Sequence, residues 1–118
     1  MEPEYVYKIL VQSLPDPLPR IIPYLNDLDA HDGYVHLSTA QQVPSTTSRF
    51  FKDYNMVYIL KISYPAIKTQ VKWENTGNHG SFPHIYGDFV ADSIVDQKSF
   101  TNNGKDWQHV LENEKWIE

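Results

Sequence analysis

Residues 56–64, M-V-Y-I-L-K-I-S-Y, restrict the fold more than any other part of the sequence. Apolar side chains form two rows along this predicted strand, with Tyr58, Leu60, Ile62 and Tyr64 on one side and Val57 and Ile59 on the other. A strand that is apolar on both sides needs cover on both sides. The segment is therefore predicted to be the central strand of a sheet, ending before Pro65.

Short strands and few helices are expected around this central strand. The predicted strands cover residues 5–11, 34–37, 71–74, 84–89 and 94–100, and residues 13–23 and 75–83 are predicted loops. The predicted helices are a brief one within residues 21–28, one after Ser38 that carries Val43, Thr47, Phe50 and Phe51 on one face, and a closing one over residues 105–116. Strands outnumber helices and do not alternate with them regularly. This order predicts an α+β fold with a bent, mostly antiparallel sheet.

Composition limits the class of protein. The chain has 118 residues, enough for a single domain over residues 1–118, and 41% hydrophobic content argues against disorder. The net charge of −5 argues against non-specific nucleic-acid binding, because an acidic surface repels phosphate backbones. No cysteine, no apolar run of membrane-spanning length and no signal-peptide pattern are present. We expect a cytoplasmic protein that does not enter the membrane; the nucleus and the oligomeric state are left open.

The stretch D-G-Y-V-H-L-S-T-A-Q-Q-V-P, residues 32–44, carries the first candidate site. Strand alternation places Tyr34, His36 and Ser38 on one face, opposite two apolar residues. Ser38 and Gln41 have the spacing of a capping box, and Pro44 is expected to kink the following helix or to occupy its first turn. The amides of Ser38 and Thr39 are then predicted to bind phosphate or ribose oxygens, with help from a lysine.

Two further strands contribute polar faces. Lys72 and Glu74 share one face of a predicted strand, and His84 and Tyr86 share one face of another. Lys8 lies on the first predicted strand. If these faces meet, one site holds an imidazole, a carboxylate, an ammonium group and aromatic rings, including Phe82. The alternative reading is structural: a histidine bonded to a neighbouring strand, an exposed Lys–Glu pair and core aromatics.

Other kinds of site have weaker support. Three metal ligands drawn from His31, Asp32, His36, Glu74, His79 and His84 are conceivable, but the H-x4-H spacing is not a recognised ligand pattern. No metal site is therefore predicted. The G-x-S-x-G elbow, the phosphate-binding P-loop and the dinucleotide glycine fingerprint are absent.

Four blocks resemble one family. The stretch of residues 32–44, then V-K-W-E, then F-P-H-I-Y-G-D-F-V-A-D-S-I-V, together with the opening Y-K-I-L, are similar to the signature of the domain-of-unknown-function family 952. The resemblance covers about residues 5–95. It implies an ADP-ribosyltransferase-like fold, with a split antiparallel sheet and a cleft that binds NAD in related enzymes. The resemblance does not imply turnover of NAD by this chain.

The catalytic pattern of those enzymes is incomplete here. Lys8 stands where they have a histidine on the first strand, His36 is an additional imidazole, and the late strand offers Tyr86 and Asp88 without a glutamate. The related phosphotransferases use several arginines, and this chain has Arg20 and Arg49 alone.

The sequence therefore leads to three hypotheses on one cleft. The first is binding of an NAD- or ADP-ribose-like ligand, with Tyr86 stacking, His36 on the ribose or as acid/base, and Glu74 stabilising charge in a transfer at the ribose C1′. The second is a small-ligand binding module without catalysis. The third is a phosphotransferase or hydrolase with His36 and His84 as the acid/base pair. The candidate catalytic residues are His36, Glu74 and His84, and the candidate ligand-binding residues are Lys8, Tyr34, Ser38, Thr39, Lys72, Phe82 and Tyr86.

Overall fold

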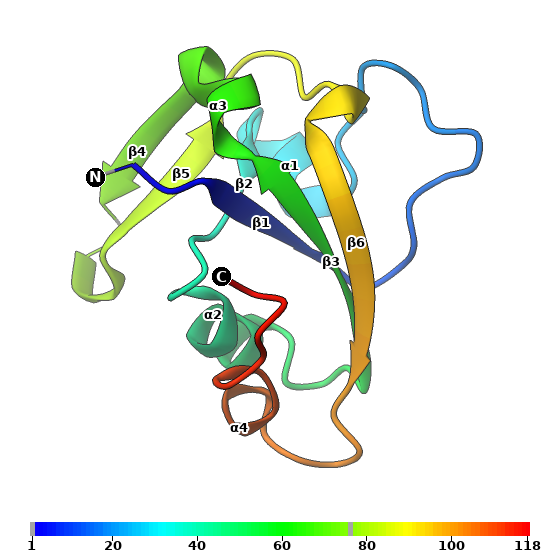
Figure 1. Cartoon of the computed structure of the whole chain (residues 1–118), viewed down its shortest axis with the longest axis vertical. Coiled ribbons are helices and arrows are strands. Elements are labelled where there is room, and N and C mark those ends of the chain that lie inside the picture. Colours follow the sequence, from blue (N-terminus) through cyan, green and yellow to red (C-terminus); the bar gives the residue numbers. More distant parts are fainter. Residues whose placement is uncertain (1, 76) are drawn as a thin grey trace.

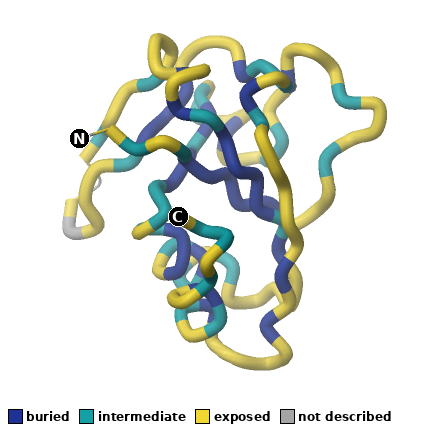
Figure 2. Tube along the Cα trace, in the orientation of Figure 1, coloured by how far each residue is buried: buried dark blue, intermediate teal, exposed yellow. Residues whose placement is uncertain are grey.

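The predicted central strand is β3, Met56–Ser63, in the middle of a three-stranded antiparallel sheet (Figure 1). β1, Tyr5–Leu10, pairs with one edge of it and β6, Ile94–Thr101, pairs with the other. The computed structural model describes residues 2–75 and 77–118. In Figure 2 the trace of β3 is buried while much of β6, the outer strand, is exposed. The prediction of a central strand covered on both sides is confirmed.

A second three-stranded sheet lies beside the first. It consists of β2, Val35–His36, then β5, Ser81–Ile85, and β4, Val71–Asn75, all antiparallel. The two sheets meet where Tyr7 on β1 and Ser38, just after β2, exchange backbone hydrogen bonds of 2.8 and 2.9 Å. The α+β class, with antiparallel sheets and few short helices, is confirmed.

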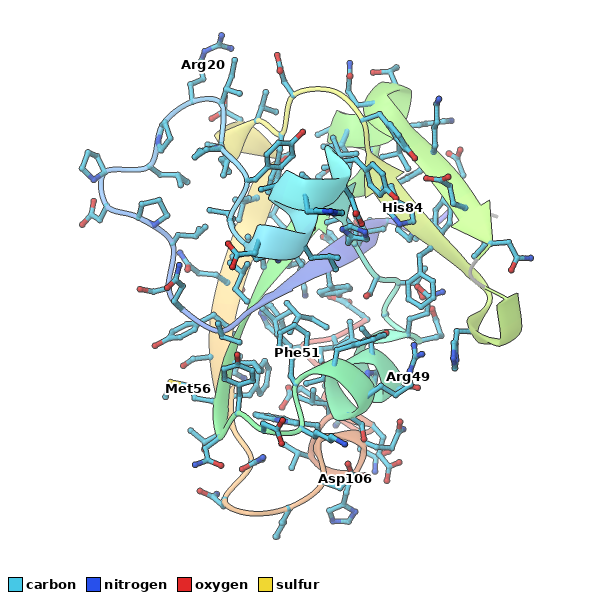
Figure 3. The ribbon with its side chains drawn as sticks, turned by 180° about the vertical axis from the view of Figure 1, so that it is seen from behind. Arg20, Arg49, Phe51, Met56, His84 and Asp106 are labelled. Atoms are coloured by element: carbon cyan, nitrogen blue, oxygen red, sulfur yellow. The ribbon has the colours of Figure 1, made fainter. Side chains whose placement is uncertain are left out.

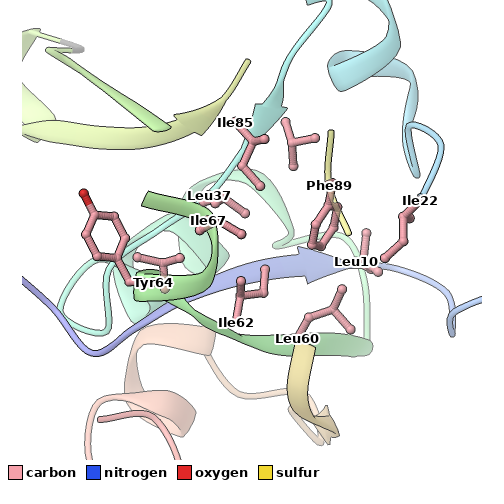
Figure 4. Packing of buried hydrophobic residues seen from close by; sticks show 11 residues of the cluster. Leu10, Ile22, Leu37, Leu60, Ile62, Tyr64, Ile67, Ile85 and Phe89 are labelled. Atoms are coloured by element: carbon pink, nitrogen blue, oxygen red, sulfur yellow. The ribbon is translucent and has the colours of Figure 1, made fainter. Parts of the chain in front are cut away.

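One hydrophobic cluster joins the two sheets (Figure 4). On β1 the residues with even numbers, Val6 and Leu10, belong to it, and so do Leu60 and Ile62 of β3. Ile85 of β5 meets them from the second sheet. Because strand side chains alternate, Lys8 shares the inner face with Val6 and Leu10. Lys8 is only 3% exposed, so the fold has to neutralise a buried charge there.

A second cluster covers the other face of the first sheet. Tyr7 and Ile9 of β1 contact it, together with the helices α2, Val43–Phe50, and α4, Trp107–Leu111. Trp107 is 1% exposed and its indole N–H donates to the carbonyls of Phe51 and Tyr54, both at 3.0 Å. These two hydrogen bonds connect α4 to the end of α2 and the turn that follows it.

The remaining elements are short. They are the helices α1, Asp27–Asp32, and α3, Tyr64–Ile67, and three 3₁₀ turns, η1, Lys68–Gln70, η2, Gly77–His79, and η3, Ala91–Ser93. Among the described residues, none of the helices has the length and hydropathy needed to cross a membrane.

Three predicted boundaries are wrong. No helix covers residues 21–28, because Ile22 donates to the carbonyl of Phe89 and the helix begins only after Asn26. The predicted strand 84–89 is displaced: β5 ends at Ile85, and the Tyr86 amide donates instead to Gln70. The closing helix ends at Leu111 rather than at residue 116.

Tertiary contacts explain why the closing helix is shorter than predicted. After Leu111 the chain turns back across the first sheet, and the indole N–H of Trp116 donates to Asp96 of β6 at 2.8 Å. The aromatic ring of Trp116 also contacts the ring of Tyr7. These tertiary contacts replace the helical hydrogen bonds that residues 112–116 would otherwise form.

Candidate functional site

Helix α1 places one buried carboxylate, that of Asp29, beneath β2. The helix is short, but both of its ends are marked: the Asn26 side chain accepts from the Asp29 amide at 2.8 Å, and Gly33 ends the helix at a φ of 82°. Asp29 is 1% exposed, and sequence analysis did not identify it.

Asp29 is the counter-ion of Lys8. Its Oδ2 lies 2.5 Å from Lys8 Nζ, and its Oδ1 lies 2.6 Å from Nδ1 of His36 and 3.2 Å from the His36 amide. Lys8 Nζ also donates to the His36 carbonyl at 3.0 Å. Burial alone raises the pKa of the Asp29 carboxyl group, but the bonds from His36 and the charge of Lys8 outweigh it, so the pKa lies below its ordinary value. Burial lowers the pKa of the Lys8 ammonium group, and Asp29 opposes that change.

His36 lies between two carboxylates. Nδ1 contacts Asp29, and Nε2 lies 3.1 Å from Oδ2 of Asp32, the last residue of α1. The buried Asp29 thus holds Nδ1 of the ring, and the partly exposed Asp32 lies against its outer nitrogen, Nε2.

His84 faces His36 from the neighbouring strand in a different environment. The two residues are paired in the β2–β5 ladder, and their ring centroids are 5.1 Å apart at an interplanar angle of 75°. His84 is 5% exposed, and its Nδ1 has no hydrogen-bond partner among the described residues. Oε1 of Glu74 lies 3.7 Å from this nitrogen. Burial, with the neighbouring His36 acting in the same direction, lowers the pKa of His84 below its ordinary value. The site thus holds one imidazole clamped by carboxylates and one desolvated imidazole.

A row of aromatic rings continues from the two histidines to the surface. The Tyr34 ring lies 4.9 Å from the His36 ring and stacks on Tyr86 at 4.7 Å. Lys72 Nζ lies 4.7 Å from the centroid of Tyr86, and the Tyr86 hydroxyl donates to Glu74. That bond is the largest cause that raises the pKa of Tyr86 to about 12. Strand alternation therefore did bring these side chains to one face of the second sheet.

A cavity of about 220 Å³ adjoins the two histidines, and we call it the first cavity. Its walls come from β1, α1, α2, η2 and β5, and in Figure 3 His84 lies on the second sheet above α2, which carries Arg49. Its lining residues are Lys8, Ile9, Asn26, Leu28, His36, Leu37, Ser38, Thr46, Arg49, Phe50, Phe51, His79, Phe82 and His84. The lining combines apolar walls with basic side chains, and no Asp or Glu of the described residues is part of it.

A second cavity of about 270 Å³ adjoins the first along α2. It is lined by Gln41, Gln42, Ser45, Thr46, Arg49, His79 and Phe82. Thr46, Arg49, His79 and Phe82 line both cavities, so the two hollows share a boundary at these side chains.

The predicted anion site at the amides of Ser38 and Thr39 is wrong. The Ser38 amide donates to Tyr7, and the Thr39 amide donates to the Gln42 side chain at 2.9 Å. The Thr39 hydroxyl accepts in return from the Gln42 amide at 3.3 Å, so the capping box lies one residue later than predicted. Neither amide is free to bind phosphate.

The structure divides the predicted site residues into two groups. Lys8, His36, Ser38, Phe82 and His84 line the first cavity, whereas Tyr34, Lys72, Glu74 and Tyr86 form the neighbouring surface row. Thr39 lines neither cavity, and Glu74 reaches the first one only through His84. Pro44 lies in the first turn of α2, which is one of the two positions that were predicted for it; the other was a kink within the helix.

Neither Asp29 nor the role of α2 as a cavity wall was predicted from the sequence. A buried Lys8 between two apolar neighbours was the available signal that a carboxylate had to lie nearby. Arg49 was noted only as one of two arginines. As for metal, the described residues contain no group of three or more His, Cys, Asp or Glu side chains that would hold an ion, and the side chain of His31 points into solvent at 87% exposure.

The fold and the cavity define a small α+β protein with two antiparallel sheets and a basic, partly apolar hollow at their junction. Residues 20–97 match the model of the family described as Protein of unknown function (DUF952), which is more than half of the chain. The chain belongs to this family, as the resemblance of its sequence blocks indicated. The match begins later than the resemblance, which started at about residue 5.

Solved structures of one bacterial protein are similar to this chain. The crystal structure of protein CC0527 from Caulobacter crescentus aligns with a TM-score of 0.75 at 21% sequence identity, covering 86% of this chain and 90% of that one. The solution NMR structure of CC0527 aligns with a TM-score of 0.66, again at 21% identity, covering 85% and 87% of the two chains. At this identity the likeness establishes the fold alone. No curated protein matches the chain.

Proposed function

We propose that this protein binds part of a nucleotide-like ligand, of the NAD or ADP-ribose type, in the first cavity. Pockets for drug-sized ligands usually start at about 300 Å³. The first cavity, at about 220 Å³, is large enough for one ring or one sugar with its substituents, but not for a whole dinucleotide. Its apolar walls suit the faces of a ring, and its basic groups suit hydroxyl or phosphate oxygens.

The observation that carries this proposal is the pair of imidazoles at the cavity. His36 and His84 both line it, with centroids 5.1 Å apart, and they have opposite surroundings. Two titratable groups of one kind with different environments are the usual arrangement for division into an acid and a base.

The geometry favours chemistry at a phosphoester over transfer at the ribose C1′. His84, with its lowered pKa, accepts a proton from an attacking hydroxyl group, and a new P–O bond forms. His36 donates a proton to the leaving oxygen as the old P–O bond breaks. A ligand oxygen reaches the outer nitrogen of His36 by replacing Asp32 there. Glu74, the predicted stabiliser of a charged sugar, does not line the cavity, and its contact with His84 suits an orienting role instead.

Calorimetry tests the binding part of the proposal. Wild-type protein is titrated with NAD, ADP-ribose and a phosphorylated RNA end, alongside His36→Gln and His84→Asn. We expect binding of at least one ligand and a loss of affinity of about tenfold or more in both variants, because the amide side chain lacks the imidazole ring and cannot reproduce its contact with the ligand, and one lost hydrogen bond is worth roughly 1.5 kcal/mol. His109→Asn is the matched control, since His109 is an exposed residue on α4. An absence of heat with every ligand would remove the proposal.

Product analysis separates an enzyme from a binding module. After incubation, mass spectrometry distinguishes released nicotinamide, which indicates transfer at ribose, from cleaved phosphoester, which indicates the histidine pair. Intact ligand that still binds with unchanged mass identifies a binding module without catalysis. A phosphoesterase activity that survives in His84→Asn would contradict the assignment of His84 as the base.

A further inference from the structure

Arg49 is a half-buried cation without an internal counter-ion. It lies in the last turn of α2 and lines both the first and the second cavity. Its guanidinium carbon lies 4.8 Å from the ring centroid of Phe50, and its Nε is buried without a hydrogen-bond partner among the described residues. No ion pair within the described part of the chain includes Arg49, although the chain carries an excess of five negative charges.

Thr46, one turn earlier on the same face of α2, is unsatisfied too. Its buried hydroxyl oxygen has no hydrogen-bond partner among the residues that the structure describes. The neighbouring Thr47 shows the ordinary arrangement, because its hydroxyl donates to the Val43 carbonyl at 2.7 Å. Thr46 lines both cavities as Arg49 does, so the two unsatisfied residues of α2 meet at the boundary of the hollows.

We propose that Arg49, supported by Thr46 and His79, binds a phosphate that links two parts of the ligand, one in each cavity. This inference rests on the proposed function and names the ligand class. A guanidinium group binds phosphate through paired N–H donors, and an unpaired buried polar group gains most from an acceptor that a ligand supplies. We expect an internal phosphate rather than a terminal one, because Arg49 lines a cavity on each side and the ligand can then extend into both.

The two cavities differ in a way that fits two different halves. The first has apolar walls and the imidazole pair, which suits a ring or sugar that carries the reacting phosphoester. The second is lined by the polar side chains of Gln41, Gln42 and Ser45, which suits a hydroxyl-rich or amide-bearing second half. A diphosphate-linked or diester-linked nucleotide has this composition, whereas a terminal phosphomonoester fills only one side.

Arg49→Gln and its control test the inference. Calorimetry compares ADP-ribose, ribose 5-phosphate and uncharged adenosine on wild type, Arg49→Gln and Arg20→Gln. Arg20 is exposed and lies far from Arg49 in Figure 3, so its replacement removes the same charge away from the cavities. We expect Arg49→Gln to weaken ADP-ribose binding by roughly 10- to 100-fold, to leave adenosine unchanged, and Arg20→Gln to have no such effect. Wild type should also bind ADP-ribose more tightly than ribose 5-phosphate.

The outcomes separate this inference from the proposed function. If ADP-ribose binds, loses affinity in His84→Asn, but keeps its affinity in Arg49→Gln, the linking-phosphate site is wrong and the histidine cavity stands. Equal affinity of wild type for ADP-ribose and ribose 5-phosphate also overturns it, because the second cavity then contributes nothing. If none of the three probes binds, both proposals fail. Thermal unfolding of Arg49→Gln, expected to match wild type, establishes that any loss is not a folding defect.

Discussion

Lys8 on β1 and Asp29 on α1 form a buried ion pair, with Nζ 2.5 Å from Oδ2 and neither side chain more than 4% exposed. The pair joins the first sheet to the helix that positions His36. Desolvation makes such a pair a weak source of net stability, but removal of one partner leaves the other charge buried and unpaired. The pair therefore governs both the fold and the orientation of the site.

Replacement of Lys8 alone is expected to destabilise the protein strongly. Lys8→Met should lower the free energy of unfolding by about 3–5 kcal/mol, because Asp29 is left without its ammonium partner. The double variant Lys8→Met with Asp29→Asn should recover part of that loss, since the buried charge is gone. Urea unfolding measures both. Additive losses in the double variant would show that the two residues do not depend on each other.

Stability should depend on pH through His84. Its pKa in the folded state lies below the ordinary value of 6.5, so the unfolded chain binds this proton more readily. The stability linked to neutral His84 is complete above pH 6.5 and decreases as the pH falls through the lower folded pKa. Urea unfolding across this window should show a steeper loss in wild type than in His84→Asn. Parallel curves would mean that His84 titrates alike in both states.

Much of this arrangement follows from sequence patterns. The two apolar rows of residues 56–64 predicted β3, and period-two alternation placed Tyr34, His36, His84 and Tyr86 on one face, because strand geometry is local and regular. Boundaries governed by tertiary contacts could not be predicted in this way. Trp116 is not helical, because its indole N–H donates a hydrogen bond to Asp96 of β6. The register of the capping box depends on the Tyr7–Ser38 pairing, which joins residues 31 positions apart.

The site was only partly predictable for the same reason. Lys8 and His36 were identified from their strands, but their common partner Asp29 lies on a short helix whose position was not predicted. The cavity is lined by α2 and η2 together with β1 and β5, which are far apart in the sequence. These are tertiary arrangements of separate elements, and neither periodicity nor spacing within one element specifies them.

Glu74 should control the ionisation of Tyr86. The hydrogen bond from the phenol to Glu74 raises the pKa of Tyr86 to about 12. Glu74→Gln removes the carboxylate charge, so the pKa of Tyr86 should move back toward its ordinary value of 10.0. NMR of ring-labelled tyrosine follows the titration, with Tyr86→Phe to assign the signal. An unchanged titration in Glu74→Gln would mean that this bond does not form in solution.

The two adjacent threonines of α2 should respond differently to loss of their hydroxyl groups. Thr47→Val should cost about 1 kcal/mol of stability, because it removes the bond to the Val43 carbonyl. Thr46→Val should be neutral or slightly stabilising, since it removes a buried hydroxyl without a partner in the described structure. Thermal unfolding compares them. A larger loss for Thr46→Val would reveal a structural partner and weaken its assignment to the ligand.

The most direct test of the central claim is NMR detection of the imidazole signals of the histidines during titration with ADP-ribose. The imidazoles that line the first cavity, those of His36, His79 and His84, should shift together and saturate, whereas the exposed His109 on α4 should stay unchanged. Saturable shifts confined to the cavity histidines are the result we predict. Unchanged signals of His36 and His84 at millimolar ADP-ribose, or a shift confined to His109, would contradict a ligand site at the junction of the two sheets.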